Sequence, residues 1–205
     1  MSAPQQVKFV VTTQSQVMNF NDLPKPLAPV ITINGVELTL KNPPTYPTGY
    51  RITILDAASD YTNPATVLYD ACSEVYPDGN TNQWASTYTY VYDNMVRAIL
   101  SYGNTNQQLV IVSSFGLDNN MPPTNGAYQE LIETGAGSQL QNWVLHNDTG
   151  SQVGNSTSWV SFPANYLFLG LSSLAYGQGF EVYQTNGQSA VNSSLTAVLA
   201  NVPAS

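Results

Sequence analysis

One stretch of the sequence decides the fold: Leu109-Val110-Ile111-Val112, a continuous apolar run of strand length. Such a run without polar alternation predicts a β-strand that is covered on both faces. It follows a helical pattern, because apolar side chains between Trp84 and Tyr102 recur every three or four residues and Gly103 ends the repeat. We therefore expect a buried strand that packs against an amphipathic helix.

Segments typical of strands and helices alternate on both sides of this run. Pro122-Pro123 begins a second predicted helix, which Gly135-Ala136-Gly137 interrupts before one or two further turns. Residues 190–200 fit a strand and a helix equally well. The alternation predicts an α/β core with crossover connections. Its other predicted strands are residues 50–56 (YRITILD), 66–69 (TVLY), 166–170 (YLFLG) and 179–183 (GFEVY).

The N-terminal part of the chain has a different pattern. Residues 7–13 are mostly β-branched or aromatic and predict a strand, and Asn34-Gly35 separates two alternating apolar runs, which is typical of a two-residue hairpin. We expect residues 1–47 to form an N-terminal β-hairpin arm and residues 48–205 to form the α/β domain. Because an isolated hairpin is only marginally stable in water, the arm must dock on this domain or on another subunit, and we expect another subunit.

The sequence is poor in charge. Only 9% of the 205 residues are charged, against roughly 25% in an ordinary soluble domain, and no lysine or arginine follows Arg97. A site for nucleic acid or for an anionic membrane surface needs clustered cations, and the formal net charge of −8 opposes both kinds of partner. We therefore expect no nucleic acid and no membrane as a partner. A surface of neutral amides and hydroxyls instead suits permanent packing against neighbouring molecules.

The sequence also lacks targeting signals and paired cysteines. The N-terminal stretch MSAPQQVKFVV has no long apolar core of the signal-peptide kind, and no run approaches the ~20 apolar residues of a membrane helix. Cys72 is the only cysteine, so no intrachain disulfide can form. We expect a protein that is made in the cytoplasm without a signal peptide.

Side chains suited to catalysis are scarce. His146 is the only histidine, and its position near a predicted helix end favours a structural role over that of a general base. Cys72 has no neighbouring cation in the sequence that would activate a nucleophile, and we interpret it as a packed thiol. The sequence has no His/Cys cluster for zinc and no phosphate-loop motif. We therefore expect no enzyme, and no catalytic residue, metal or cofactor.

Two weaker patterns indicate where a ligand could bind. Asp118-Asn119-Asn120 offers oxygen ligands for a calcium ion, but a turn explains these residues as well, because Asp and Asn tolerate left-handed backbone. The polar segment 76–90 is rich in rings, and aromatic and amide side chains together can stack on sugars or anchor a protein interface. A place in the core and its rim is the alternative for these rings, above all for Trp84. The candidate ligand-binding residues are Asp118, Asn119, Asn120, Tyr76 and Tyr88, with Tyr61 and Tyr90 in the same ring-rich region.

Three blocks of the sequence resemble the ILEI/PANDER domain of the FAM3-like, cytokine-like proteins. Residues 50–56 (YRITILD) are similar to the first core strand of that family, and residues 95–118, which include LVIVSS and FGLD, resemble its helix, strand and turn. Residues 166–181, with YLFLG and GFE, resemble its ending. The resemblance implies a compact sheet covered by helices. It also implies binding rather than catalysis, because the same module is a sugar-binding unit in the stem of a protein O-mannose N-acetylglucosaminyltransferase.

The sequence departs from that family in two ways. The secreted members have paired cysteines, whereas Cys72 stands alone, and residues 1–47 have no counterpart. We interpret the protein as a non-enzymatic structural component of a large assembly. A tailed-phage virion protein of the tail, baseplate or capsid decoration is the favoured case, with other virion proteins and copies of itself as partners. The alternative is a carbohydrate-binding module that attaches to glycans, such as those of a host.

Overall fold

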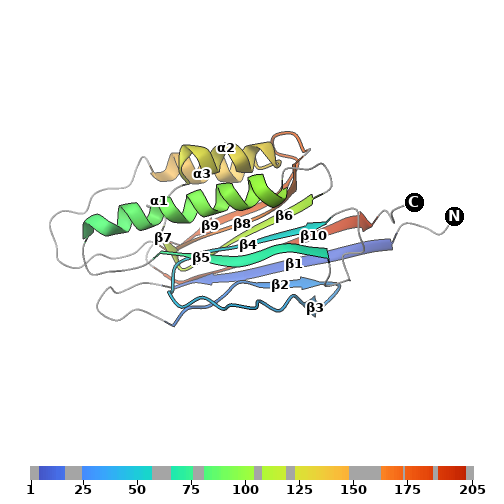
Figure 1. Cartoon of the computed structure of the whole chain (residues 1–205), viewed down its shortest axis with the longest axis horizontal. Coiled ribbons are helices and arrows are strands. Elements are labelled where there is room, and N and C mark those ends of the chain that lie inside the picture. The colour runs from blue at the N-terminus through green and yellow to red at the C-terminus, as the bar shows by residue number, and fades with distance from the viewer. Residues whose placement is uncertain are drawn as a thin grey trace.

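The computed structural model arranges the chain in three layers: a four-stranded outer sheet, a larger central sheet, and a layer of helices (Figure 1). Paired strands are antiparallel in both sheets. The predicted mixed α/β fold is therefore confirmed, with strands predominating. The structure describes residues 5–16, 25–56, 66–75, 81–103, 108–118, 123–147, 163–172, 174–186 and 189–201.

The outer sheet combines strands from both ends of the sequence. It contains β1 (Gln5–Ser15), β2 (Val30–Ile33), β3 (Val36–Glu37) and β10 (Val191–Asn201). Their order is β10-β1-β2-β3. β1 and β10 pair along their whole lengths. Within residues 190–200, which fitted a strand and a helix equally, all but the first therefore belong to a strand.

The central sheet contains β4 (Gly49–Asp56), β5 (Val67–Glu74), β6 (Gln108–Phe115), β7 (Leu117–Asp118), β8 (Pro163–Leu171) and β9 (Phe180–Thr185). Their order is β5-β4-β6-β8, and β7 and β9 each pair with β8. Because β5 and β6 are both antiparallel to β4, they run parallel to each other on its two sides. Helix α1 (Thr81–Ala98) joins β5 to β6, which confirms a predicted crossover connection.

Helices cover the face of the central sheet that points away from the outer sheet (Figure 1). α1 continues into a π-helical turn, Ile99–Gly103, and is followed in sequence by α2 (Asn125–Glu133) and α3 (Ser138–Asn147). The predicted apolar face of α1 is confirmed for Val91, Tyr92, Met95 and Ile99, which are buried, whereas Tyr102 is 44% exposed.

Side chains of the central strands divide between two cores, because successive residues of a strand point to opposite faces. Val110 and Val112 pack in the core under the helices, whereas Leu109 and Ile111 pack in the core between the two sheets. All four are fully buried. The prediction of a strand covered on both faces is therefore confirmed.

The predicted hairpin of the N-terminal segment is also confirmed. Asn34 and Gly35 form the turn between β2 and β3, with φ angles of 51° and 82°. Both values lie in the left-handed region that a two-residue hairpin of this kind requires. The Asn34 side chain accepts a hydrogen bond from the Lys8 backbone N–H at 2.9 Å, so the turn is tied to β1 as well.

The expectation that the arm docks on another subunit is wrong for its apolar side chains. Phe9 and Val11 of β1 and Ile31 of β2 are fully buried against residues of the central sheet, such as Leu167. The arm is held further by a buried guanidinium, that of Arg51 in β4, which donates to the backbone carbonyls of residues 29 and 38 at 2.8 and 2.9 Å. The physical reason is that the outer face of a six-stranded apolar sheet needs cover, and this chain supplies it.

Candidate functional site on the outer sheet

The exposed face of the outer sheet is almost free of charge. Strand alternation sends every second side chain of β1 and β10 outward, and these are mainly hydroxyls and amides. Within the described strands of this sheet, Lys8 and Glu37 are the charged residues on this face, and Lys25, in the segment before β2, lies at its end. Across the β1–β10 pair the outward partners are Gln14 with Asn192, Thr12 with Ser194, and Val10 with Thr196.

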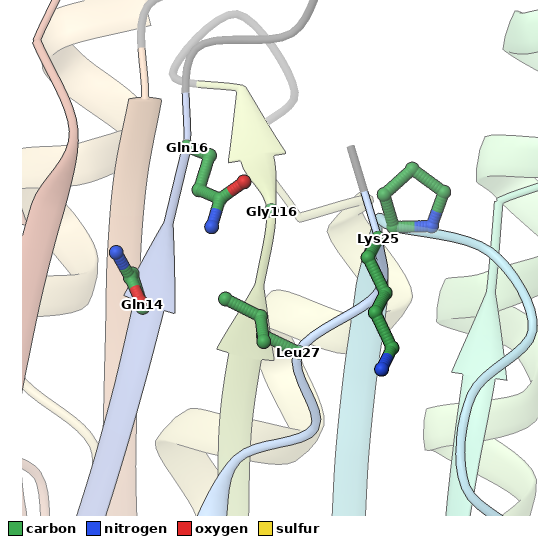
Figure 2. Close-up of a pocket in the computed structure, with 6 residues that line it drawn as sticks. Gln14, Gln16, Lys25, Leu27 and Gly116 are labelled. Atoms are coloured by element: carbon green, nitrogen blue, oxygen red, sulfur yellow. The ribbon is translucent and has the colours of Figure 1, made fainter. Parts of the chain in front are cut away.

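A groove of about 450 Å³ lies at one end of this face. Its base is formed by β1 and β10, and the segment before β2 supplies an apolar wall. A smaller hollow lies beside it, and Figure 2 shows Gln14 and Gln16 across from Leu27 there. Gln14 and Leu27 line both spaces. The full lining of the groove is Thr12, Thr13, Gln14, Leu27, Ala28, Val30, Asn192, Ser193 and Ser194.

A buried hydrogen-bond network fixes the base of the groove on the central sheet. The Ser15 hydroxyl donates to the backbone carbonyl of Ala164 at 2.7 Å. The Asn165 amide donates to the Val191 carbonyl and to the Ser193 hydroxyl, both at 3.0 Å, and Ser193 donates to Gln184 at 2.8 Å. Satisfied buried networks of this kind hold one arrangement of the chain. The network therefore fixes the strands at the base of the groove in one arrangement.

A second surface with binding character lies on the helical side of the central sheet. The rings of Tyr69 in β5 and Tyr102 in the π-helical turn stack with centroids 5.3 Å apart. Burial raises the pKa of Tyr69 above its usual value, and the neighbouring Tyr102, Asp70, Cys72 and Tyr90 raise it further. Tyr90 is 51% exposed. These three tyrosines form the tyrosine surface, which offers ring faces and phenol groups to a ligand.

The residues predicted from the sequence as ligand-binding fall largely outside what the structure describes. Asp118 lies in β7 opposite Pro163, but only its backbone is described. Tyr88 lies in α1 and His146 in α3, again as backbone alone. The calcium-type site and the cluster around segment 76–90 therefore stay predictions. Outside the described residues altogether are Asn119, Asn120, Tyr61 and Tyr76.

Cys72 lies half-buried in β5. Burial raises the pKa of its thiol to about 12, although the nearby Arg51 guanidinium acts in the opposite direction. The thiol is therefore protonated at neutral pH, and only the thiolate is a strong nucleophile. Within the ranges that the structure describes, no group of three His, Cys, Asp or Glu residues is placed to hold a metal ion.

Glu181 is a carboxylate that the sequence did not single out as functional. One oxygen accepts from the Gly137 backbone N–H at 2.8 Å, and the other accepts from the Tyr166 hydroxyl at 2.8 Å and from the Leu140 backbone N–H at 3.3 Å. A negative group at this place satisfies the free N–H groups at the start of α3. The geometry therefore assigns Glu181 a structural role. In the sequence it stood out as the one charge of an otherwise neutral strand and as part of the GFE block that resembles the ILEI/PANDER ending, and neither signal indicated this role.

A comparison with protein-family models finds none that matches the chain, and a comparison with curated proteins finds no similar sequence. Among the helices in the described ranges, none combines the length and the apolar character that crossing a membrane requires.

Proposed function

We propose that the protein is a non-enzymatic structural component of a large assembly, with a tailed-phage virion protein of the tail, baseplate or capsid decoration as the favoured case. The observation that carries the proposal is the outer face of the outer sheet, a broad surface of neutral hydroxyl and amide side chains. Such a surface can be buried against a neighbour without removing unpaired charges from water. The partners are other virion proteins and copies of this chain.

Co-sedimentation of the purified protein with phage virion particles tests this proposal. Thr12→Glu places a charge on the outer face, in the lining of the groove, where burial against a partner would leave it unpaired. Gln141→Glu makes the same change on the exposed side of α3 and serves as the control. We expect the wild-type chain and the control to sediment with particles, and Thr12→Glu to stay in the supernatant. A wild-type chain that stays monomeric at high concentration and joins no particle would contradict the proposal.

A carbohydrate-binding module is the second candidate. The groove supports it, because Thr12, Gln14 and Asn192 can bond sugar hydroxyls beside the apolar wall, and the tyrosine surface supports it through stacking. Calorimetry with neutral glycans tests both surfaces. Asn192→Ala should weaken binding at the groove, and Tyr102→Ala should weaken binding at the tyrosine surface. A glycan array without any bound sugar would exclude this function.

The finer fold assignment is also a proposal. A sheet covered by helices on one face supports the resemblance to the ILEI/PANDER domain. The outer sheet covers the other face, and its first three strands come from residues 1–47, for which that family has no counterpart. An experimental structure that superimposes the central sheet and its helices on a member of the family tests the assignment.

A further inference from the structure

We propose that the free edge of β10 is a self-association site, where β10 of a second copy pairs antiparallel and joins two outer sheets into one. This inference rests on the proposed function, because it names the contact between copies that such an assembly uses. Sheet edges present unpaired N–H and C=O groups that another strand can bond. Within the described residues, β1 is the strand that pairs with β10.

β10 is the least protected of the four sheet edges. Natural edge strands are usually short, charged or interrupted. β3 has two residues and carries Glu37, β5 contains Asp70 and Glu74 and has a register shift against β4, and β9 has six residues. By contrast, β10 has 11 residues, with neither charge nor proline, and it keeps one register with β1 throughout.

The hydrogen-bond pattern shows which groups of β10 face the free edge. In an antiparallel ladder the N–H and C=O of one residue point to the same side, and successive residues alternate. The Lys8 carbonyl accepts from the Asn34 N–H at 2.8 Å, so Lys8 points toward β2. Phe9 consequently points toward β10, where its partner is Ala197. The residues of β10 that direct their backbone groups to the free edge are therefore Asn192, Ser194, Thr196, Val198 and Ala200.

A second copy of this chain fits the edge because β10 is complementary to itself. We consider a two-fold axis that passes through Thr196 perpendicular to the sheet. It places Thr196 of one copy opposite Thr196 of the other, and Ser194 of one copy opposite Val198 of the other, so outward side chains meet outward side chains. Buried side chains likewise meet buried ones, and the central sheets stay on one side. Although the chain carries a net charge of −8, no charge lies on β10, so like charges do not oppose the contact there. The pairing also covers part of Val198, which is 50% exposed.

Two variants of Thr196 give a matched test in the full-length protein. Thr196→Pro removes an N–H that points to the free edge, leaves the β1–β10 hydrogen bonds in place, and is tolerated at an edge strand for that reason. Thr196→Val keeps the N–H and the shape and is the control. In analytical ultracentrifugation we expect dimers of the wild type and of Thr196→Val, and dimerisation weaker by about tenfold or more for Thr196→Pro. Circular dichroism melting confirms that each variant is folded.

A measurement on the wild type keeps the test independent of the proline variant. By NMR hydrogen exchange, the amides of Ser194, Thr196 and Val198 should gain protection as the protein concentration rises, whereas Leu195 and Ala197 are protected throughout. Protection that does not change with concentration would overturn the proposal, as would a folded Thr196→Pro variant that dimerises like the wild type. A monomeric wild type that still sediments with particles would overturn self-pairing but leave the proposed function standing. If, in that case, Thr196→Pro no longer sedimented with particles, the result would indicate that the free edge of β10 pairs with a strand of a different protein.

Discussion

The guanidinium of Arg51 faces the carboxylate of Asp70 across β4 and β5 through two hydrogen bonds, from Nε to Oδ1 at 2.9 Å and from Nη2 to Oδ2 at 2.8 Å. The two side chains are only 1% and 9% exposed. The Thr53 hydroxyl donates to the same carboxylate at 2.7 Å. Since Arg51 also binds backbone carbonyls on both sides of the hairpin, this ion pair joins the central sheet to the outer one.

Removing the guanidinium should therefore lower stability strongly. Arg51→Met leaves the Asp70 carboxylate buried without its partner, and we expect the free energy of unfolding to fall by about 3–5 kcal/mol. Arg97→Met, at an exposed position of α1, is the matched control and should stay within about 0.5 kcal/mol of the wild type. Urea unfolding followed by circular dichroism measures both. Equal decreases in the free energy of unfolding of the two variants would show that the buried ion pair contributes no more to stability than an exposed arginine does.

A glycine at the end of β6 should be irreplaceable for steric reasons. Gly116 has a φ of +54°, and a Cβ there would lie 1.8 Å from the Pro47 carbonyl oxygen. Gly35 has a φ of +82° but open space around it. Gly35→Ala should cost about 1–2 kcal/mol from the backbone conformation alone. Gly116→Ala adds a backbone clash and should cost about 4 kcal/mol or more. Thermal melting of the two variants compares them, and similar melting temperatures would contradict the close approach.

Stability should fall at alkaline pH because buried tyrosines resist ionisation. Burial, and then the neighbouring Glu181, raise the pKa of Tyr166 well above 10.0, and burial raises that of Tyr183 to about 12. The unfolded chain releases these protons near pH 10, so the contribution of the two tyrosines to stability is complete below that pH and falls above it. The slope is up to about 1.4 kcal/mol per pH unit for the fully buried Tyr166 and smaller for the half-exposed Tyr183, which solvent screens. Urea midpoints at several pH values above 10 measure the slope. Tyr166→Phe should make it shallower, and an unchanged slope would show that another group titrates.

Deleting residues 1–47 should not leave a soluble domain. The deletion removes β1, β2 and β3, uncovers Ile111, Leu167 and Leu169 of the central sheet, and takes away the ladder partner of β10. We expect the truncated chain to aggregate and to lose its cooperative melting transition. Light scattering and circular dichroism, with the full-length chain as control, check this. A soluble truncated chain with a sharp transition would mean that the outer sheet is an accessory layer.

The sequence predicted those features that depend on neighbouring residues. Asn34-Gly35 predicted its turn because the required backbone angles restrict the residues that fit. The run at residues 109–112 predicted its strand because burial on both faces excludes polar side chains. Residues 190–200 were ambiguous, because small polar and apolar side chains are mixed there and the apolar ones fit a period of two as well as a helical period.

The pairing of β1 with β10 could not be predicted in the same way, because nothing local to either strand specifies its partner. The groove depends on that pairing, and its side chains come from segments far apart in the sequence, such as Thr12 and Asn192. Sequence reasoning looked instead for clustered rings and acids. Tyr69 and Tyr102 were missed as a pair because a strand and a π-helical turn bring them together.

Closing the outer sheet with the first and last strands has a consequence for folding. Among the described strands, β1 is synthesised first and its ladder partner β10 last. The β1–β10 pairing, which includes Phe9 and Val11, can therefore form only after all the other strands have been made. Contacts of such long sequence separation have a high entropic cost of loop closure and slow the folding of β-rich proteins. The central sheet and its helices, whose strands lie closer in sequence, can assemble first. The outer sheet is then the last part of the molecule to form, and its apolar strands are exposed to other chains for the longest time.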